Sequence, residues 1–271
     1  MKNKDKKIKN KIDKGLSVCG EATGAVASSS IGLWVGGPVG VFVGAVGGKL
    51  ARDFILILKK DFENRFLSEW EKERINITAE SVRERIQSNY NQGLQVRNDD
   101  FFTNGSISER STAYEIFEGT FIAAKNEHEE KKLKYYGNLV ANIAYHKEID
   151  RYHANYLLRI AERLSYRQIC ILALFKRKSN YALSSNFHEL LKTFDQNKMI
   201  IVREIEEIKI LHLLQSLPSK EAIIGGGPAG NITPATTELS ETGNIIHTMM
   251  NLDEIESSEI DRLAAILSDP V

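Results

Sequence analysis

Apolar residues recur at helical spacing through most of the chain. Phe62, Phe66 and Trp70 stand four positions apart among charged residues, and the segment from Val82 to Tyr90 repeats this spacing, which predicts a long amphipathic helix. Three similar runs follow a turn-rich segment at 98–108, and short connections between such helices favour an antiparallel bundle. Their apolar positions are Ile116, Phe117 and Phe121; Leu133, Tyr136, Leu139, Val140 and Ile143; and Tyr156, Leu157, Ile160 and Leu164. The expected fold class is therefore mainly α, with a helical-bundle body.

After residue 165 the pattern changes to short helices and short strands. Ser165 and Gln168 have the spacing of a capping box and mark a helix start before the apolar run 169–175. The further elements expected are helices at 186–194, 199–217 and 244–251, and strands at 222–224 and 235–239 around a loop at 225–233. This order, with the turn at 239–243, resembles a winged helix. The resemblance implies a winged-helix-like α+β module at the C-terminal end.

The N-terminal part shows neither pattern. Residues 22–48 are 27 residues without a charged side chain, long enough as a helix to exceed the roughly 30 Å hydrocarbon core of a bilayer. Small residues recur there at every fourth position and would form a nearly bare stripe along a helix. The stripe consists of Gly20, Gly24, Ser28, Gly32, Gly36, Gly40, Gly44 and Gly48. Each glycine would cost a soluble helix about 1 kcal/mol relative to alanine, whereas in lipid small residues let helices approach closely.

This row of eight residues, the glycine row, resembles the glycine zippers of membrane-inserting and pore-forming proteins. The resemblance implies a membrane and homo-oligomer contact made by the row, and it brings no catalytic residue. Gly37 and Pro38 interrupt the run and predict a kink or a hairpin tip. A kinked single span that ends at Lys49 fits the bilayer better than a hairpin, because Lys49, Arg52 and Asp53 shorten the second arm of a hairpin. A soluble protein that buries the row in a helical hairpin is the alternative.

Charge is unevenly distributed, although 36 basic residues balance 36 acidic ones. Residues 1–14 contain seven lysines and two aspartates, a net charge of +5, and residues 200–271 contain four basic and twelve acidic residues, a net of −8. A basic head before an apolar run is attracted to anionic lipid by roughly 1 kcal/mol per lysine. The expected organisation is a flexible head (1–14), a glycine-zipper membrane segment (15–60), an amphipathic connector (61–97), a linker (98–108), a helical bundle (109–164) and an acidic winged-helix-like module (165–271).

Few residues suggest catalytic or cofactor chemistry. Two cysteines far apart, Cys19 and Cys170, exclude a disulfide scaffold and a cysteine-based zinc site. Gly225, Gly227 and Gly230 match the dinucleotide fingerprint, but the apolar run before them is too short for its strand and too few residues follow for the domain. We therefore expect no cofactor.

Two charged clusters also invite a functional interpretation. His146, Asp150 and His153 have the spacing of one helix face, but a ferritin-like site needs Glu-x-x-His on two helices and two more glutamates, so no metal is expected. The charged run 127–134 is typical of a solvated helix face with pairs four residues apart, and we assign it no function.

The expected third helix of the winged-helix-like module is acidic, with Glu204, Glu206 and Glu207 against Arg203 and Lys209. Nucleic-acid affinity depends on Lys and Arg at phosphates, so a protein partner is expected instead of nucleic acid. The sequence predicts a non-enzymatic bacterial protein at the inner (cytoplasmic) membrane, with its body in the cytoplasm. A membrane-perturbing effector of a toxin or phage-defence system is the most concrete hypothesis. The alternative is a soluble cytoplasmic interaction or regulatory protein.

Overall fold

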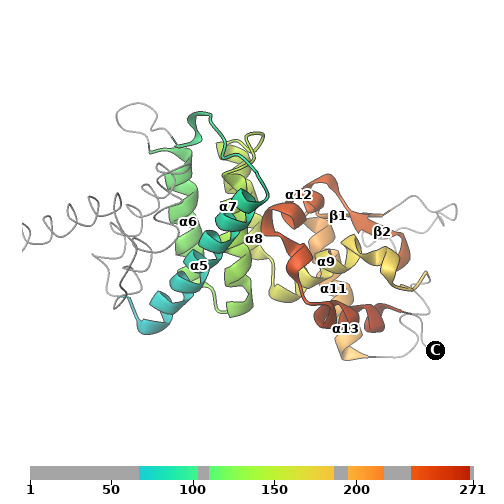
Figure 1. The fold of residues 1–271 in the computed structure, drawn as a ribbon. Coiled ribbons are helices and arrows are strands. Elements are labelled where there is room, and N and C mark those ends of the chain that lie inside the picture. The colour runs from blue at the N-terminus through green and yellow to red at the C-terminus, as the bar shows by residue number, and fades with distance from the viewer. Residues whose placement is uncertain (1–66, 103–109, 186–194, 217–232, 269–271) are drawn as a thin grey trace, which may run out of the picture. The chain divides into compact units, whose positions relative to one another are not determined.

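The computed structural model describes residues 67–102, 110–185, 195–216 and 233–268 (Figure 1). The described residues form eight α-helices, five short 3-10 helices and one two-stranded sheet, which confirms the mainly helical fold class. The glycine row with Gly37 and Pro38, the helix expected at 186–194, the strand expected at 222–224 and the fingerprint glycines lie outside these ranges. No helix within them has the length and apolarity needed to cross a bilayer.

The chain divides into two compact units. Of the described residues, unit 1 contains those from 67 to 126 and the segment Ala141–Arg151, and unit 2 contains Glu127–Val140 and those from 152 to 268. Helix α5 (Glu69–Asn91) of unit 1 begins at Ser68, whose hydroxyl accepts the Glu71 N–H while the Glu71 carboxylate accepts the Ser68 N–H. It packs against α6 (Thr112–Asn126), as Figure 1 shows. The amphipathic helix predicted from the apolar spacing is thus confirmed over its described part.

A buried arginine fastens the chain after α5 to the end of α7 (Leu133–Ile143). The Arg97 guanidinium pairs with Asp99 at 2.5 Å and lies 4.3 Å from the centre of the Phe101 ring. It donates hydrogen bonds of 2.7–3.2 Å to the carbonyl oxygens of His146, Lys147 and Ile149. Because helix C-termini leave carbonyl groups without helical partners, one planar guanidinium can hold the turns that follow α7 in place.

Unit 2 is built around one helix that is buried on all sides. Helix α9 (Tyr166–Lys176) begins at the predicted capping box, which is confirmed, and every residue from Gln168 to Phe175 is buried. It contacts α11 (Gln196–Ile210), α12 (Glu241–Met250) and α13 (Ser257–Leu267). Helix α8 (Arg151–Arg163) precedes it and, with α6 and α7, confirms the three helices predicted from the apolar spacing.

The small sheet of unit 2 differs from the prediction. Strand β1 (Leu214–Ser216) pairs antiparallel with β2 (Thr237–Leu239), with Leu214 opposite Leu239. The helix expected at 199–217 instead ends at Ile210, so its predicted end is wrong. His212 adopts a left-handed conformation with φ of 58°, which turns the chain out of the helix and into β1.

Candidate functional site

A cluster of ionisable side chains is buried at the start of unit 2. The Lys132 Nζ atom lies 2.5 Å from the Glu127 carboxylate, and the Tyr136 hydroxyl donates a 2.6 Å hydrogen bond to the same group. Glu127 is 7%, Lys132 2% and Tyr136 1% exposed. The prediction that run 127–134 is a solvated face is therefore wrong for Glu127 and Lys132. We call these three residues the Glu127 cluster.

Local structure explains how the cluster forms. The 3-10 helix η2 (Glu130–Lys132) places Lys132 beside Glu127, and α7 begins at the next residue. Tyr136 follows one helical turn after Lys132, whose ammonium group lies 5.3 Å from the centre of the Tyr136 ring. The sequence signal was a lysine four residues before a tyrosine at the end of a charged run, which alone does not reveal burial.

The hydrogen bonds fix the protonation states of the cluster. Burial by itself would raise the pKa of Glu127, but the hydrogen bonds from Lys132 and Tyr136 outweigh it and hold that pKa below its ordinary value. Burial and the hydrogen bond to Glu127 raise the pKa of Tyr136 well above its ordinary value. At neutral pH Glu127 is therefore a carboxylate and Tyr136 a neutral phenol.

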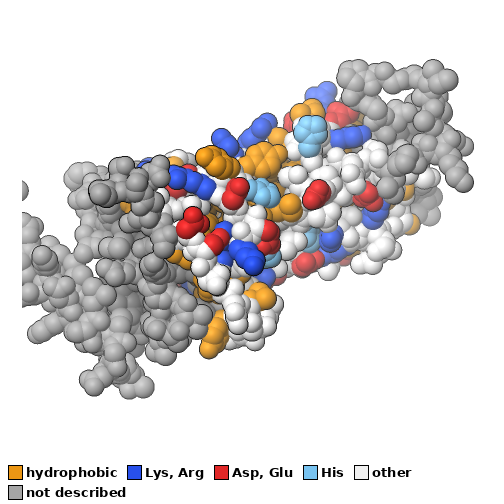
Figure 2. Space-filling model, turned by 90° about the horizontal axis from the view of Figure 1, so that it is seen from above, with side chains coloured by type: hydrophobic (Ala, Val, Ile, Leu, Met, Phe, Trp, Pro, Cys, Tyr) orange, Lys and Arg blue, Asp and Glu red, His pale blue; other side chains and the backbone are white. Residues whose placement is uncertain are grey.

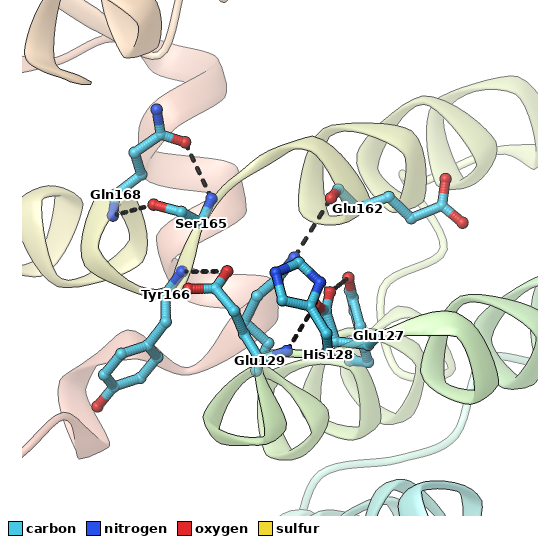
Figure 3. A network of polar contacts seen from close by, with 9 residues as sticks. Glu127, His128, Glu129, Glu162, Ser165, Tyr166 and Gln168 are labelled. Carbon is cyan, nitrogen blue, oxygen red and sulfur yellow. Dashed lines mark hydrogen bonds and ion pairs between the residues drawn. The ribbon is translucent and has the colours of Figure 1, made fainter. Parts of the chain in front are cut away.

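The same region holds the start of the core helix α9, as Figure 3 shows. Lys132 also donates to the carbonyl oxygen of Glu162, near the end of α8, at 3.3 Å. The Glu129 carboxylate accepts the Tyr166 N–H at 3.1 Å, in the first turn of α9, where the helix dipole favours negative charge. Ser165 and Gln168 complete their capping box beside it. Four consecutive segments, from 127 to α9, are thus joined by charge-assisted hydrogen bonds.

This arrangement favours a structural role over catalysis. Glu127 already accepts hydrogen bonds from both Lys132 and Tyr136, so its charge is neutralised within the cluster. Cys170, on α9, is buried, and burial raises the pKa of its thiol to about 11, so it is protonated at neutral pH. The cluster and its neighbours hold the end of α8 and the first turn of α9 in fixed positions.

The structure corrects the expected geometry of the histidine cluster. Helix α8 begins at Arg151, so His146 and Asp150 precede it and do not share a helix face with His153. His146 Nδ1 instead lies 2.5 Å from Glu148. Among the described residues, no three His, Cys, Asp or Glu side chains are grouped so that they could hold a metal ion.

Acidic residues of α11 take part in packing within unit 2. Glu204 receives two hydrogen bonds from the Arg167 guanidinium, at 2.5 and 3.0 Å, and Glu207 accepts one from Gln168 at 2.8 Å. Both partners lie on α9. Two of the three carboxylates that make this helix acidic therefore hold α11 on the core helix. Ile200 and Ile210, by contrast, are exposed.

A close backbone approach joins β1 to α12. The Ser240 N–H donates to the Leu213 carbonyl at 3.0 Å, and the Ser240 hydroxyl donates to the His212 carbonyl at 2.6 Å and accepts the Gly243 N–H at 3.0 Å. The Leu213 carbonyl oxygen also occupies the space that a Cβ atom at position 243 would need. Only glycine fits there, which gives a physical reason for the turn noted at 239–243.

Comparison of the chain with known protein families, with curated proteins and with solved structures found no match. On the face drawn in Figure 2, basic, acidic and hydrophobic side chains are interspersed.

Proposed function

We propose that the protein is a non-enzymatic, membrane-associated bacterial protein that oligomerises through its glycine row and presents a regulatory body at the cytoplasmic face of the inner membrane. One observation carries this proposal: eight small residues stand at strict four-residue spacing from Gly20 to Gly48, and seven of them, from Gly24 onward, lie within the 27 uncharged residues 22–48. In water these glycines would cost a helix several kcal/mol, at about 1 kcal/mol each. Close helix packing in lipid compensates that cost.

The basic head supports the membrane assignment. Its net charge of +5 over residues 1–14 lies directly before the apolar run. Anionic lipid attracts such segments, at roughly 1 kcal/mol for each nearby lysine. A membrane-perturbing effector of a toxin or phage-defence system is the role that we assign, because zippers of this kind occur in proteins that insert into membranes and form pores.

For the C-terminal unit we propose a winged-helix-like module that contacts protein. The order α9, α11, β1, β2 and α12, the antiparallel pairing of β1 with β2 and the Gly243 contact support this fold. The net charge of −8 over residues 200–271 repels phosphate backbones and so favours a protein partner over nucleic acid.

A bulky residue in the glycine row tests the proposal. Gly40→Leu should abolish the oligomers that a lipid-soluble crosslinker traps in membranes, because leucine separates the helices at their contact. Ala45→Leu, which adds similar bulk one residue off the row, should leave them intact. Oligomers that survive Gly40→Leu, or that disappear equally in both variants, would refute the glycine row as the contact.

The second candidate is a soluble cytoplasmic interaction protein that packs the glycine row internally. Lys49, Arg52 and Asp53 favour it, because they leave a hairpin arm after Pro38 too short to cross a bilayer. Cell fractionation without detergent separates the two candidates: the soluble form stays in the supernatant, and the membrane form sediments with lipid.

A further inference from the structure

Helix α8 carries an exposed aromatic and basic stripe. Tyr152, Tyr156, Arg159 and Arg163 follow one another at spacings of four, three and four residues, so they lie on one helix face. Tyr152 is 82% and Tyr156 42% exposed, and both arginines are exposed. We call these four residues the α8 stripe.

The stripe contributes nothing to the core of its own unit. The core face of α8 is formed by other residues, namely Ala154, Leu157, Leu158, Ile160 and Ala161. Arg159 and Arg163 form no ion pair within the described ranges, although Glu162 is near enough to interact electrostatically with Arg159. Tyrosine and arginine are, with tryptophan, enriched at the energetic centres of protein interfaces. The stripe thus has the composition of a docking surface that needs an acidic partner.

An acidic surface lies in the same unit. The acidic segment comprises the exposed carboxylates of η5 (Leu252–Glu254) and of the region at the start of α13, which are Asp253, Glu254, Glu256 and Asp261. Asp253 has a side chain that is 71% exposed. Within the described ranges, neither Asp253 nor Glu256 pairs with a lysine or an arginine. Next to them, Glu254 pairs with Lys134 and Glu259 with Lys131, so this surface already binds basic side chains of α7 and of the segment before it.

From this complementarity we propose that the α8 stripe of one copy docks on the acidic segment of a second copy. Two arginines attract an anionic bilayer by only about 2 kcal/mol, at roughly 1 kcal/mol each. The net charge of −8 over residues 200–271 opposes binding both to such a bilayer and to nucleic acid. A second copy instead brings carboxylates to the arginines. If both copies make this contact reciprocally, it gives a two-fold dimer; if it runs in one direction, it builds a ring or an open array according to whether the rotation closes.

Photo-crosslinking of the full chain tests this contact. Tyr152→p-benzoylphenylalanine would be introduced into one preparation and mixed with isotopically heavy copies of the unmodified chain. Crosslinked peptides should join position 152 of a light copy to residues 251–262 of a heavy copy. The same photoreactive group at exposed Tyr90 should not reach that segment. Crosslinks confined to one copy, to lipid, to nucleic acid or to other proteins would overturn the proposal.

A charge swap adds a second criterion. Arg159→Glu with Arg163→Glu, or Asp253→Lys with Glu256→Lys, should each reduce the crosslink between copies by about tenfold or more, as expected for hot-spot charges. Combining the four changes should restore it, which a folding defect would not do. An unchanged yield in either variant, or no recovery in the combination, would contradict the contact. This experiment identifies which two peptides are joined and does not measure oligomer size. A negative result would therefore refute the contact of the α8 stripe without bearing on oligomerisation through the glycine row.

Discussion

The Lys132 ammonium group lies 2.5 Å from the Glu127 carboxylate, and both side chains are less than a tenth exposed. Removing one member of a buried pair leaves the other charge without compensation, whereas replacing both can be nearly neutral. The pair also sits where η2, α7, α8 and α9 meet within unit 2. Loss of the pair should therefore destabilise the core helix α9 as well as the residues next to the pair.

Lys132→Met should destabilise unit 2 by about 3 to 5 kcal/mol, because Glu127 stays buried without its partner. Glu127→Gln combined with Lys132→Met should lose less than Lys132→Met alone. Amide hydrogen exchange of α9 peptides measures the loss. Lys131→Met is the matched control: it removes an exposed pair with Glu259, which solvent screens, and should change the exchange of α9 far less. An equal loss of α9 protection in Lys131→Met and Lys132→Met would contradict the structural role of the buried Lys132–Glu127 pair.

Gly243→Ala should destabilise unit 2 by about 2 to 3 kcal/mol, since its methyl group would collide with the Leu213 carbonyl. In a helix without this obstruction, glycine to alanine would stabilise the protein by about 1 kcal/mol. A stabilised variant would therefore contradict the close contact with Leu213. Thr242→Ala, one residue earlier, should stay within about 0.5 kcal/mol of the unmodified protein. Hydrogen exchange of α12 and β1 peptides measures both variants.

Stability of unit 2 should fall as the pH drops from about 6.5 toward 4. His247 is 1% exposed, and burial lowers its pKa to about 4 despite the nearby Asp253 carboxylate. The unfolded chain binds a proton at the ordinary pKa of 6.5, and the folded chain does not until near 4. The contribution is therefore complete above 6.5 and is lost on acidification, by on the order of 3 kcal/mol.

His247→Leu should remove most of this pH dependence, which hydrogen exchange of α12 peptides at each pH would compare with the unmodified protein. His212→Asn is the control, because His212 is exposed and asparagine tolerates its left-handed backbone. That variant should keep the original pH dependence. A His247→Leu profile that matches the unmodified one would show that the dependence arises elsewhere.

Arg97→Lys should loosen the segment after α7 in unit 1. Lysine keeps the charge but lacks the planar fork that reaches three carbonyl oxygens and Asp99 together. We expect a loss of about 2 to 3 kcal/mol, as for other buried charged hydrogen bonds, seen as faster exchange in peptides covering 141–151. Arg110→Lys, at an exposed pair with Glu118, should leave exchange unchanged. Protection that persists in Arg97→Lys would contradict this role.

Helix positions in the described ranges were predictable where the signal was local. The apolar spacing of α6, α7 and α8 and the capping box of α9 depend only on neighbouring residues, and these helices were predicted correctly. Helix α13 was missed, although Ile260, Leu263, Ala264 and Leu267 have helical spacing. The end of α11 was also missed, because the turn uses His212 at positive φ and contains neither glycine nor proline.

The candidate site was not predictable from the sequence. Glu127 and Lys132 stand in a run of alternating charge that is usually solvated, and only the packing around η2 and α8 buries them. The α8 stripe was not predictable either, because one of its residues was expected to be buried and is exposed. Tyr156 was expected in the apolar face of α8, but it is exposed, and the buried positions nearby are Ala154, Leu157 and Leu158.

Extraction of membranes tests the central claim most directly. Cells would express the full chain or a variant that lacks residues 15–48, and their membranes would be washed with high salt and then with alkaline carbonate. We predict that the full chain resists both washes and that the deletion variant is released, because only the apolar glycine-rich segment inserts into lipid. Recovery of the full chain in the soluble fraction would contradict membrane insertion.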